Sequence, residues 1–320
     1  MRRDLVLCAM GVTALLGQPA KAQETTLRAV SFVRLDDVWG KLFVEFVKRV
    51  NDNGKGLVQI RMMGGPETIN QFELGNAIKT GVVDIGMLPG GFYQSLFPAA
   101  LALSISTKSP IEQRQNGAWE QLNKLHNSQV NAQLLANYGF GVPFHIYTSK
   151  PIEKADMTGL KLRTVPIYRP FFEKLGATTL QTQHAELYTA LERGVVDGYG
   201  WSLWGLKEQG FLPVTKFRIE PGFYSGNVSV LVNLTKWQAL RPDQQAFLSK
   251  TAIDFEQDFV QVATRQSDEE RQKQDSAGVK IIKLAPADAD RFVTMARDAG
   301  WADVQQKAPA DYQQLRALME

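Results

Sequence analysis

Two octapeptides of this 320-residue chain share one pattern: A-I-K-T-G-V-V-D at residues 77–84 and A-L-E-R-G-V-V-D at residues 190–197. In each copy a helix is expected to stop at the glycine, the chain reverses, and the two valines lead into a buried strand. The aspartate is then expected near the carboxyl end of that strand. The repetition predicts two lobes of similar build, although a turn that any α/β chain reuses would give the same residues.

Strands and helices are expected to alternate around each octapeptide in the same order. Around the first copy, strands are expected over 26–33, 57–62 and 82–87, and helices over 38–50 and 69–80. Around the second copy, strands are expected over 160–165 and 195–199, and helices over 168–175 and 185–193. This order favours open sheets with helices on their faces, which is an α/β fold. Because open sheets bind ligands beyond the carboxyl ends of their strands, two facing lobes predict a ligand cleft.

A long helix is expected after the second lobe. Pro242 suits the first turn of a helix, and no further glycine or proline follows before Gly278. At about 1.5 Å per residue such a helix is roughly 54 Å long, so it must lie across both lobes. Two helices broken near residues 266–267 would be the alternative. The tail from Pro286 predicts two short helices.

Residues 1–22 have the pattern of an export signal. Two arginines precede an apolar run over 5–17, and residues 20–22 form an A-x-A cleavage site, so Gln23 is expected to begin the mature chain. The apolar run is shorter than the ~20 residues of a membrane span. Cys8, the single cysteine, lies inside this signal. We therefore expect a periplasmic protein without disulfides.

The composition excludes several classes of function. Lys+Arg number 36 against Asp+Glu 33, and this balance argues against a nucleic-acid surface and against a polybasic membrane anchor. Three histidines and one cysteine leave little material for a metal site, so no metal or cofactor is expected. With 44% hydrophobic residues and no second apolar run of membrane-spanning length, we expect a globular protein without stable membrane insertion.

Several motifs in order resemble a known family. They are D-M-T-G-L-K-L-R at 156–163, L-G-A at 175–177, A-E-L-Y-T-A-L-E-R-G-V-V-D-G at 185–198 and V-N-L-T-K-W-Q-A-L at 232–240. Together they resemble the solute-binding subunit of tripartite ATP-independent periplasmic (TRAP) transporters, the dicarboxylate-binding (DctP-like) family. The resemblance covers essentially the whole mature chain. It implies a two-lobed periplasmic binding protein with a hinge, a cleft, a long helix spanning both lobes and no catalysis.

The resemblance also implies the division of the chain and its partners. We expect lobe I to contain residues 23–144 and about 230–255, and lobe II to contain 145–229 and about 280–320, with the helix over 242–277 spanning both. The partners implied are a small carboxylate ligand and the membrane permease subunits of the transporter.

Two departures from the family pattern bear on the ligand. The family commonly follows V-V-D-G with Q-E-N-P, whose asparagine contacts the ligand, and Trp201 takes that position in this chain. Many members carry an arginine about 20 residues before the last arginine of G-L-K-x-R, and Phe144 and His145 lie there instead. Because aromatic groups replace polar contacts, we expect a monocarboxylate with an apolar or aromatic body, with or without a 2-oxo or hydroxy group, rather than a dicarboxylate or sugar acid.

Arg163 is the main candidate for binding the ligand. It ends an expected strand that points at the cleft, and the family uses this arginine to hold the carboxylate of the ligand. A guanidinium presents a rigid fork of donors that matches a carboxylate in a bidentate manner. A surface arginine or a structural ion pair is the alternative.

Aromatic residues near expected strand ends are further candidates. They are Trp201 and Trp204 after the second octapeptide, Phe92 and Tyr93 after the first, and Phe223 and Tyr224 before another expected strand. Such rings would cover the apolar body of a ligand, although packing inside a lobe would explain each of them as well. Trp201 and Tyr224, with Tyr93 and Phe144, are the ones assigned to the ligand.

Four polar positions complete the candidate site or lie near it. Glu67 follows a Gly-Gly-Pro break and would accept a hydrogen bond from a ligand hydroxyl, unless it is a solvated loop residue. Asn227 and His145 are weaker candidates for polar contacts. Arg169 is a possible second anion contact, although an exposed helix face explains it better.

Two other classes of function compete with this one. A binding protein of the ABC-importer type would have the same lobes but another permease. An exported hydrolase needs a nucleophile, a base and an orienting group, and G-F-Y-S-G at 222–226 lacks the G-x-S-x-G spacing. We therefore expect no enzymatic activity.

Overall fold

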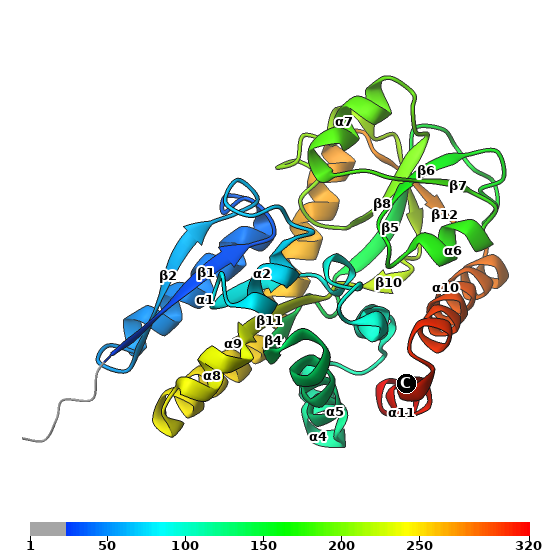
Figure 1. Cartoon of the computed structure of the whole chain (residues 1–320). Helices are drawn as coiled ribbons and strands as arrows, with labels where there is room; N and C mark the ends of the chain where they lie inside the picture. The colour runs from blue at the N-terminus through cyan, green and yellow to red at the C-terminus, as the bar shows by residue number, and fades with distance from the viewer. Residues whose placement is uncertain (1–23) are drawn as a thin grey trace, which may run out of the picture.

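A computed structural model describes residues 24–320, so the expected export signal lies outside the described residues. The described chain folds around two β-sheets, with the first near the N-terminus and the second formed mainly by the middle of the chain (Figure 1). None of the described helices is both long enough and apolar enough to span a membrane.

The first sheet contains the strands expected around the first octapeptide. Its strand order is β2-β1-β3-β11-β4, in which β1 is parallel to β2 and β3, and β11 is antiparallel to β3 and β4. The bounds are β1 Thr25–Ser31, β2 Val58–Gly64, β3 Ile85–Leu88, β4 Ala132–Tyr138 and β11 Val228–Asn233. The strand β11 comes from a distant part of the chain and closes this sheet.

The second sheet contains the strands expected around the second octapeptide. Its order is β12-β9-β5-β8-β6-β7, with the short β10 paired to β5. The bounds are β5 Pro143–Thr148, β6 Lys161–Thr164, β7 Thr178–Gln181, β8 Gly198–Ser202, β9 Phe217–Glu220, β10 Tyr224–Ser225 and β12 Lys280–Lys283. Only β6 and β8 of this sheet were expected from the sequence. Among the strands that were not expected, β7 is short, largely exposed and at the edge of the sheet.

Helices cover the faces of both sheets. Those beside the first sheet are α1 Val38–Asn53, α2 Leu74–Thr80, α4 Pro110–Asn116, α5 Ala118–Leu125 and α8 Leu234–Ala239. The short α3 Ala102–Ile105 contacts β10. Those beside the second are α6 Arg169–Lys174 and α7 His184–Glu192. Helix α2 begins five residues later than the expected 69–80, because Asn70 accepts a hydrogen bond from the Phe72 amide and forms a turn there.

The two octapeptides form the same local structure. Gly81 and Gly194 both have the left-handed conformation, with φ of 77° and 67°, as expected for glycines that end helices. The expected place of the aspartates is wrong, because Asp84 and Asp197 each come directly before a strand and so lie at its amino end. Asp84 accepts from the amide of Arg28 in β1, and Asp197 accepts from the first amide of β6. Each aspartate therefore fixes the neighbouring parallel strand and is remote from the carboxyl ends.

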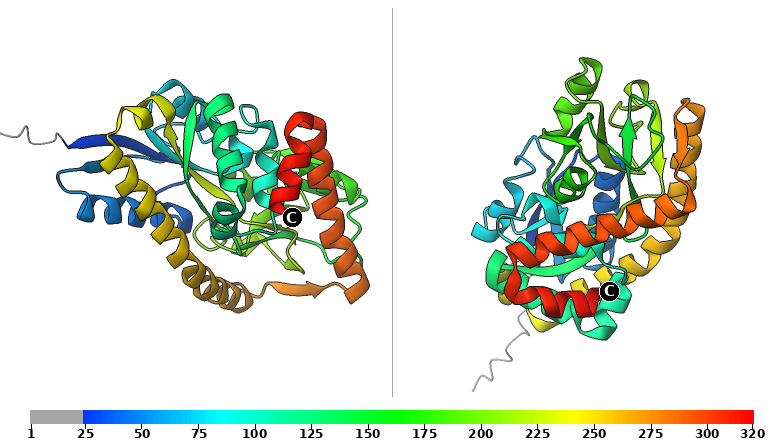
Figure 2. Two further views of the ribbon diagram at one scale, coloured as in Figure 1. Left: turned by 90° about the horizontal axis from the view of Figure 1, so that it is seen from below. Right: turned by 90° about the vertical axis from the view of Figure 1, so that its right-hand side faces the viewer.

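Helix α9, Pro242–Ser276, is continuous over 35 residues, which confirms the expected single long helix. Its first half packs against α1 and β4 of the first sheet, and its second half reaches the second sheet (Figure 2). No break occurs near residues 266–267, because Ser267 is buried and accepts a hydrogen bond from the Trp204 indole at 2.9 Å. Helix α9 therefore ties the two sheets together.

The C-terminal segment differs from its expected place. Helix α10, Pro286–Lys307, has 22 residues and is not short, and α11, Pro309–Met319, packs against α3, α4 and α5 beside the first sheet (Figure 2). The Met319 carbonyl accepts from the Thr107 amide at 2.9 Å, which fixes the end of the chain there. The segment of about 280–320 therefore does not lie wholly with the second sheet.

The chain also passes between the sheets at residues 139–142 and 226–227. These two crossings lie side by side, and a Cβ on Gly226 would be only 2.7 Å from the Gly139 carbonyl oxygen. Glycine is therefore required where the crossings touch. Two short crossings beside one long helix are the arrangement of a hinge between two lobes.

Candidate functional site

The two lobes touch each other along the edges of one cavity. Trp39 of α1 stacks on Trp204 with ring centroids 4.9 Å apart, and the Gln209 amide donates to the Asp37 carboxylate at 2.7 Å. Gly91 lies so close to Ile167 that a Cβ on Gly91 would be 2.4 Å from Ile167 Cγ2. These contacts join the first sheet and its helices to the second, so the structure is the closed arrangement of the lobes.

The cavity between the lobes has mostly apolar walls. The rings that line it are Phe32, Trp39, Phe92, Phe144, Tyr168 and Trp201, and the polar side chains are Asp37, Arg163, His184, Ser202, Gln209 and Asn227. The centre of a water-sized sphere can move through about 60 Å³ of it. One water needs only about 10–15 Å³ on this measure, so the cavity has room for a small organic molecule.

Arg163 is completely buried at the wall of this cavity. Strand β6 carries it, and its side chain is held by the Thr182 carbonyl, which accepts from Nε at 3.2 Å and from Nη2 at 2.8 Å. Nη1 donates to the Tyr168 hydroxyl at 3.2 Å, and this hydroxyl donates in turn to the Gly200 carbonyl. Three of the five N–H groups are thus used, and one remains on each terminal nitrogen.

Arg163 has no acidic partner. In the part of the chain that the structure describes, no carboxylate lies within ion-pair distance of its guanidinium, unlike the buried Arg218, which is paired with Glu220 at 3.0 Å. Burial lowers the pKa of Arg163 below its usual value, although an arginine remains charged. A buried and unpaired cation is costly, so this wall of the cavity favours an anion.

Trp201 and His184 form the side of the cavity next to Arg163. The Arg163 guanidinium lies 5.7 Å from the centre of the Trp201 ring, and the His184 ring meets Trp201 edge-on at 4.5 Å. From the first lobe, Phe92 approaches His184 at 5.9 Å. The rings of both lobes therefore form an apolar enclosure beside the cation.

Phe144 and Asn227, two more of the assigned residues, also line the cavity. Phe144 packs against the Tyr168 ring at 6.3 Å. The Asn227 amide is already engaged with protein groups, since its oxygen accepts from the Gly90 amide and its nitrogen donates to Asn137 at 2.7 Å. Of the eight assigned residues, the structure therefore brings Arg163, Trp201, Phe144 and Asn227 to the cavity.

The other four assigned residues lie away from the cavity. Tyr93 is buried inside the first lobe, where its hydroxyl donates to Ser229 at 3.2 Å. The Tyr224 hydroxyl donates to the Ala296 carbonyl of α10. Glu67 is exposed and accepts from the Gly65 amide. These side chains have protein partners that explain their positions without a ligand.

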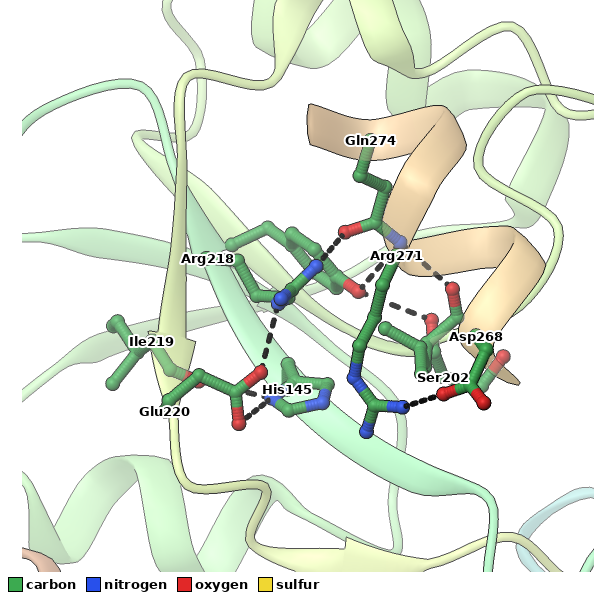
Figure 3. A network of polar contacts seen from close by, with 10 residues as sticks. His145, Ser202, Arg218, Ile219, Glu220, Asp268, Arg271 and Gln274 are labelled. Atoms are coloured by element: carbon green, nitrogen blue, oxygen red, sulfur yellow. Dashed lines mark hydrogen bonds and ion pairs between the residues drawn. The ribbon is translucent and has the colours of Figure 1, made fainter. Parts of the chain in front are cut away.

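His145, the fourth, belongs to a polar network behind the second sheet (Figure 3). Its Nδ1 donates to the Ile219 carbonyl at 2.9 Å, and Glu220 lies 3.8 Å away. Arg218 joins Glu220 to Gln274 of α9, since it donates to the latter at 2.7 Å. This network attaches the long helix to the second sheet.

The protonation of His145 makes the stability of the protein depend on pH. Burial lowers the pKa of His145 to about 4, whereas an unfolded histidine titrates near 6.5. The unfolded chain therefore binds a proton at this residue below about pH 6.5, whereas the folded protein binds it only below about pH 4. The free energy of unfolding therefore falls as the pH is lowered from about 6.5 to about 4.

We expect this histidine to account for about 2 kcal/mol of the free energy of unfolding that is lost between pH 7 and pH 5. Urea unfolding at both pH values would measure it, with His145→Gln as the variant that cannot titrate. The expected result is a smaller pH dependence in His145→Gln. An equal pH dependence in both proteins would contradict it.

Four polar residues that line the cavity were missed by sequence reasoning: Asp37, His184, Ser202 and Gln209. Asp37 caps α1 by accepting from the Trp39 amide, and burial raises its pKa above the usual value. Gln209 meets it only because the lobes close. His184 lies just after strand β7, which was not expected from the sequence. Its place after the end of a strand was the one signal that could have marked it as a cavity residue. Among the described residues, no cluster of three histidine, cysteine or acidic side chains suits a metal ion.

Two α/β lobes closed on a cavity, joined by two crossings and one long helix, define a two-lobed periplasmic binding protein. The model of the bacterial extracellular solute-binding protein family 7 (DctP) matches residues 30–306. The chain therefore belongs to this family, whose members are the solute-binding subunits of TRAP transporters. This confirms the resemblance drawn from the motifs and separates the chain from the ABC-importer type.

Individual relatives are distant, and their matches cover from about two thirds of the chain to nearly all of it. A solute-binding protein of Roseobacter denitrificans is 22% identical over 304 residues, which are 92% of each chain. A monocarboxylate 2-oxoacid-binding periplasmic protein of Nostoc sp. is 23% identical over 239 residues, 69% of this chain and 65% of that one. Among solved structures, a TRAP periplasmic solute-binding protein from Desulfovibrio salexigens with bound orotic acid has a TM-score of 0.82 at 22% identity, covering 92% of this chain and 97% of that one.

Proposed function

We propose that this protein captures a small monocarboxylate with an apolar or aromatic body in the periplasm and delivers it to the membrane permease of a TRAP transporter. The single observation that carries the proposal is Arg163, a fully buried guanidinium at a cavity wall with no acidic partner among the described residues. Its two unused N–H groups lie on the two terminal nitrogens, which is the fork that a carboxylate binds.

The charges in the cavity support a ligand with one carboxylate. Arg163 is the cation at its wall, and the first lobe contributes the Asp37 carboxyl, which would repel a second carboxylate. The remaining wall is mainly apolar, and this suits an apolar body. The orotic acid of the Desulfovibrio salexigens structure and the pyroglutamic acid of a Bordetella pertussis receptor (TM-score 0.80, 19% identity, covering 92% and 99%) are small acids with one carboxylate each.

Binding by closure of the lobes follows from the contacts between them. The Trp39–Trp204 stack and the Gln209–Asp37 hydrogen bond join opposite lobes and are lost when the lobes separate. A carboxylate at Arg163 neutralises the buried charge in the closed form and shifts the population toward it. The closed form is then the one that the permease receives. The roles assigned to the cavity residues are binding and closure, without a chemical step.

A thermal-shift screen of the purified mature protein against carboxylic acids tests the proposal. A ligand at 100 times its Kd stabilises the folded state by about 2.7 kcal/mol, so small monocarboxylates with apolar bodies are expected to raise the Tm by roughly 5 °C or more. Neutral sugars, amines and dicarboxylates serve as comparison sets. Stabilisation by neutral sugars or by dicarboxylates alone would overturn the proposal.

A further inference from the structure

His184 lies at the cavity wall next to Arg163 and makes no hydrogen bond to any described residue. It is the first residue of α7, two positions after Thr182, whose carbonyl holds the Arg163 guanidinium. The fixed guanidinium and the imidazole thus come from one short segment between β7 and α7. The nitrogens of this imidazole have no hydrogen-bond partner in the described protein, so a ligand in the cavity can supply one.

The orientation of the imidazole is restricted by rings on two sides. Trp201 meets it edge-on at 4.5 Å with an interplanar angle of 64°, and Phe92 of the opposite lobe lies 5.9 Å away at 59°. Because Phe92 belongs to the first lobe, closure completes this enclosure. The ring is therefore presented to the cavity in a defined orientation, as a residue that selects a ligand must be.

His184 is neutral in the folded protein. The surrounding protein lowers its pKa well below the usual value, and the nearby Arg163 charge lowers it further. A neutral imidazole has one N–H donor and one acceptor nitrogen. It therefore adds hydrogen-bonding capacity beside the cation without adding a second positive charge, and the site still matches one carboxylate.

We propose that His184 is a specificity-determining residue that hydrogen-bonds an oxygen substituent adjacent to the carboxylate of the ligand, which makes 2-oxo and 2-hydroxy monocarboxylates the preferred class. This rests on the proposed function, because Arg163 must hold the carboxylate. Arg163 and His184 both contact the Trp201 ring, so an acid held by the guanidinium and lying against Trp201 brings its second carbon toward the imidazole. An acid without that oxygen leaves the imidazole unsatisfied in a closed cavity, which costs affinity.

Two pairs of acids that differ only at the second carbon test the proposal. Calorimetry would compare 4-methyl-2-oxopentanoate with 4-methylpentanoate, and 3-phenyllactate with 3-phenylpropanoate, in the full mature protein. We expect at least one of the pairs to show a preference of about tenfold or more for the oxygenated acid, the size that one polar group left unsatisfied in the closed cavity produces.

Two variants separate hydrogen bonding from ring packing. His184→Phe keeps a ring against Trp201 but removes the donor and acceptor, and the preference is expected to fall to within about twofold. His184→Asn restores a donor and an acceptor and is expected to recover part of the preference. A preference of unchanged size in His184→Phe would overturn the role of His184. If the wild type binds both members of each pair equally, the assignment of His184 fails while the proposed function stands, and if it binds neither member of either pair, both fail.

Discussion

Replacing Arg163 with methionine is expected to weaken binding of the carboxylate ligand by about a hundredfold or more. The two free N–H groups would form charge-assisted hydrogen bonds with the carboxylate, each worth roughly 1.5–3 kcal/mol, and 1.4 kcal/mol corresponds to a tenfold change in Kd. Isothermal titration calorimetry with the best acid from the thermal-shift screen measures the loss.

The ligand-free Arg163→Met variant should remain folded. Methionine fills most of the space of the arginine stem, and replacing a buried charge by an apolar side chain is often neutral or stabilising. A melting temperature that lies at most a few degrees below that of the wild type would show that the variant is folded. The loss of binding would then not be caused by unfolding.

Arg169 provides the matched control. It lies six residues further along, on the exposed face of α6, where it is paired with Glu173 at 2.8 Å. Arg169→Met removes the same charge from the same lobe and should leave the Kd unchanged. Arg163→Lys should fall between, because an ammonium cannot form the bidentate pair. An Arg163→Met protein that binds within threefold of the wild type would contradict the role of this residue.

Replacing Gly91 with valine is expected to prevent closure and to weaken binding by about a hundredfold. The backbone at Gly91 has no positive φ, so the fold tolerates a side chain there. In the closed form, however, its Cβ would lie 2.4 Å from Ile167 Cγ2 and 3.4 Å from Ile167 Cβ, which is the root of that side chain. The lobes must therefore stay apart, and the ligand loses the contacts of one of them.

The partner residue of the clash supplies the rescue. Ile167→Ala removes the methyl group that Gly91→Val would strike, so the double variant should bind at least tenfold better than Gly91→Val alone. Small-angle scattering with saturating ligand should show compaction in the wild type and none in Gly91→Val. Equal compaction and equal affinity in both proteins would contradict closure at this contact.

The repeated octapeptides and the long helix made the architecture predictable from the sequence. The glycine stops, the strand around 162 and the continuous α9 depend on local chemistry, which a sequence displays directly. The two aspartates were expected at the carboxyl ends of their strands but lie at the amino ends. The first valine of each pair is exposed in the turn, and the hydrogen-bonded strand begins only after the aspartate. A boundary shift of three residues therefore reversed the expected end of the strand.

The side-chain directions in the cavity were less predictable. Phe144 and His145 are neighbours in β5, yet one faces the cavity and the other faces α9, since successive residues of a strand point to opposite sides. The sequence does not show which face is which. Likewise, Asp37 and Gln209 are 172 positions apart, and their contact exists only when the lobes meet.

A crystal structure of the protein with the bound acid would show whether Arg163 holds the carboxylate. We predict a carboxylate whose two oxygens lie about 2.7–2.9 Å from Nη1 and Nη2 of Arg163, with the body of the ligand between Trp201 and the rings of the first lobe. A ligand in this cavity that makes no contact with the Arg163 guanidinium would contradict the account.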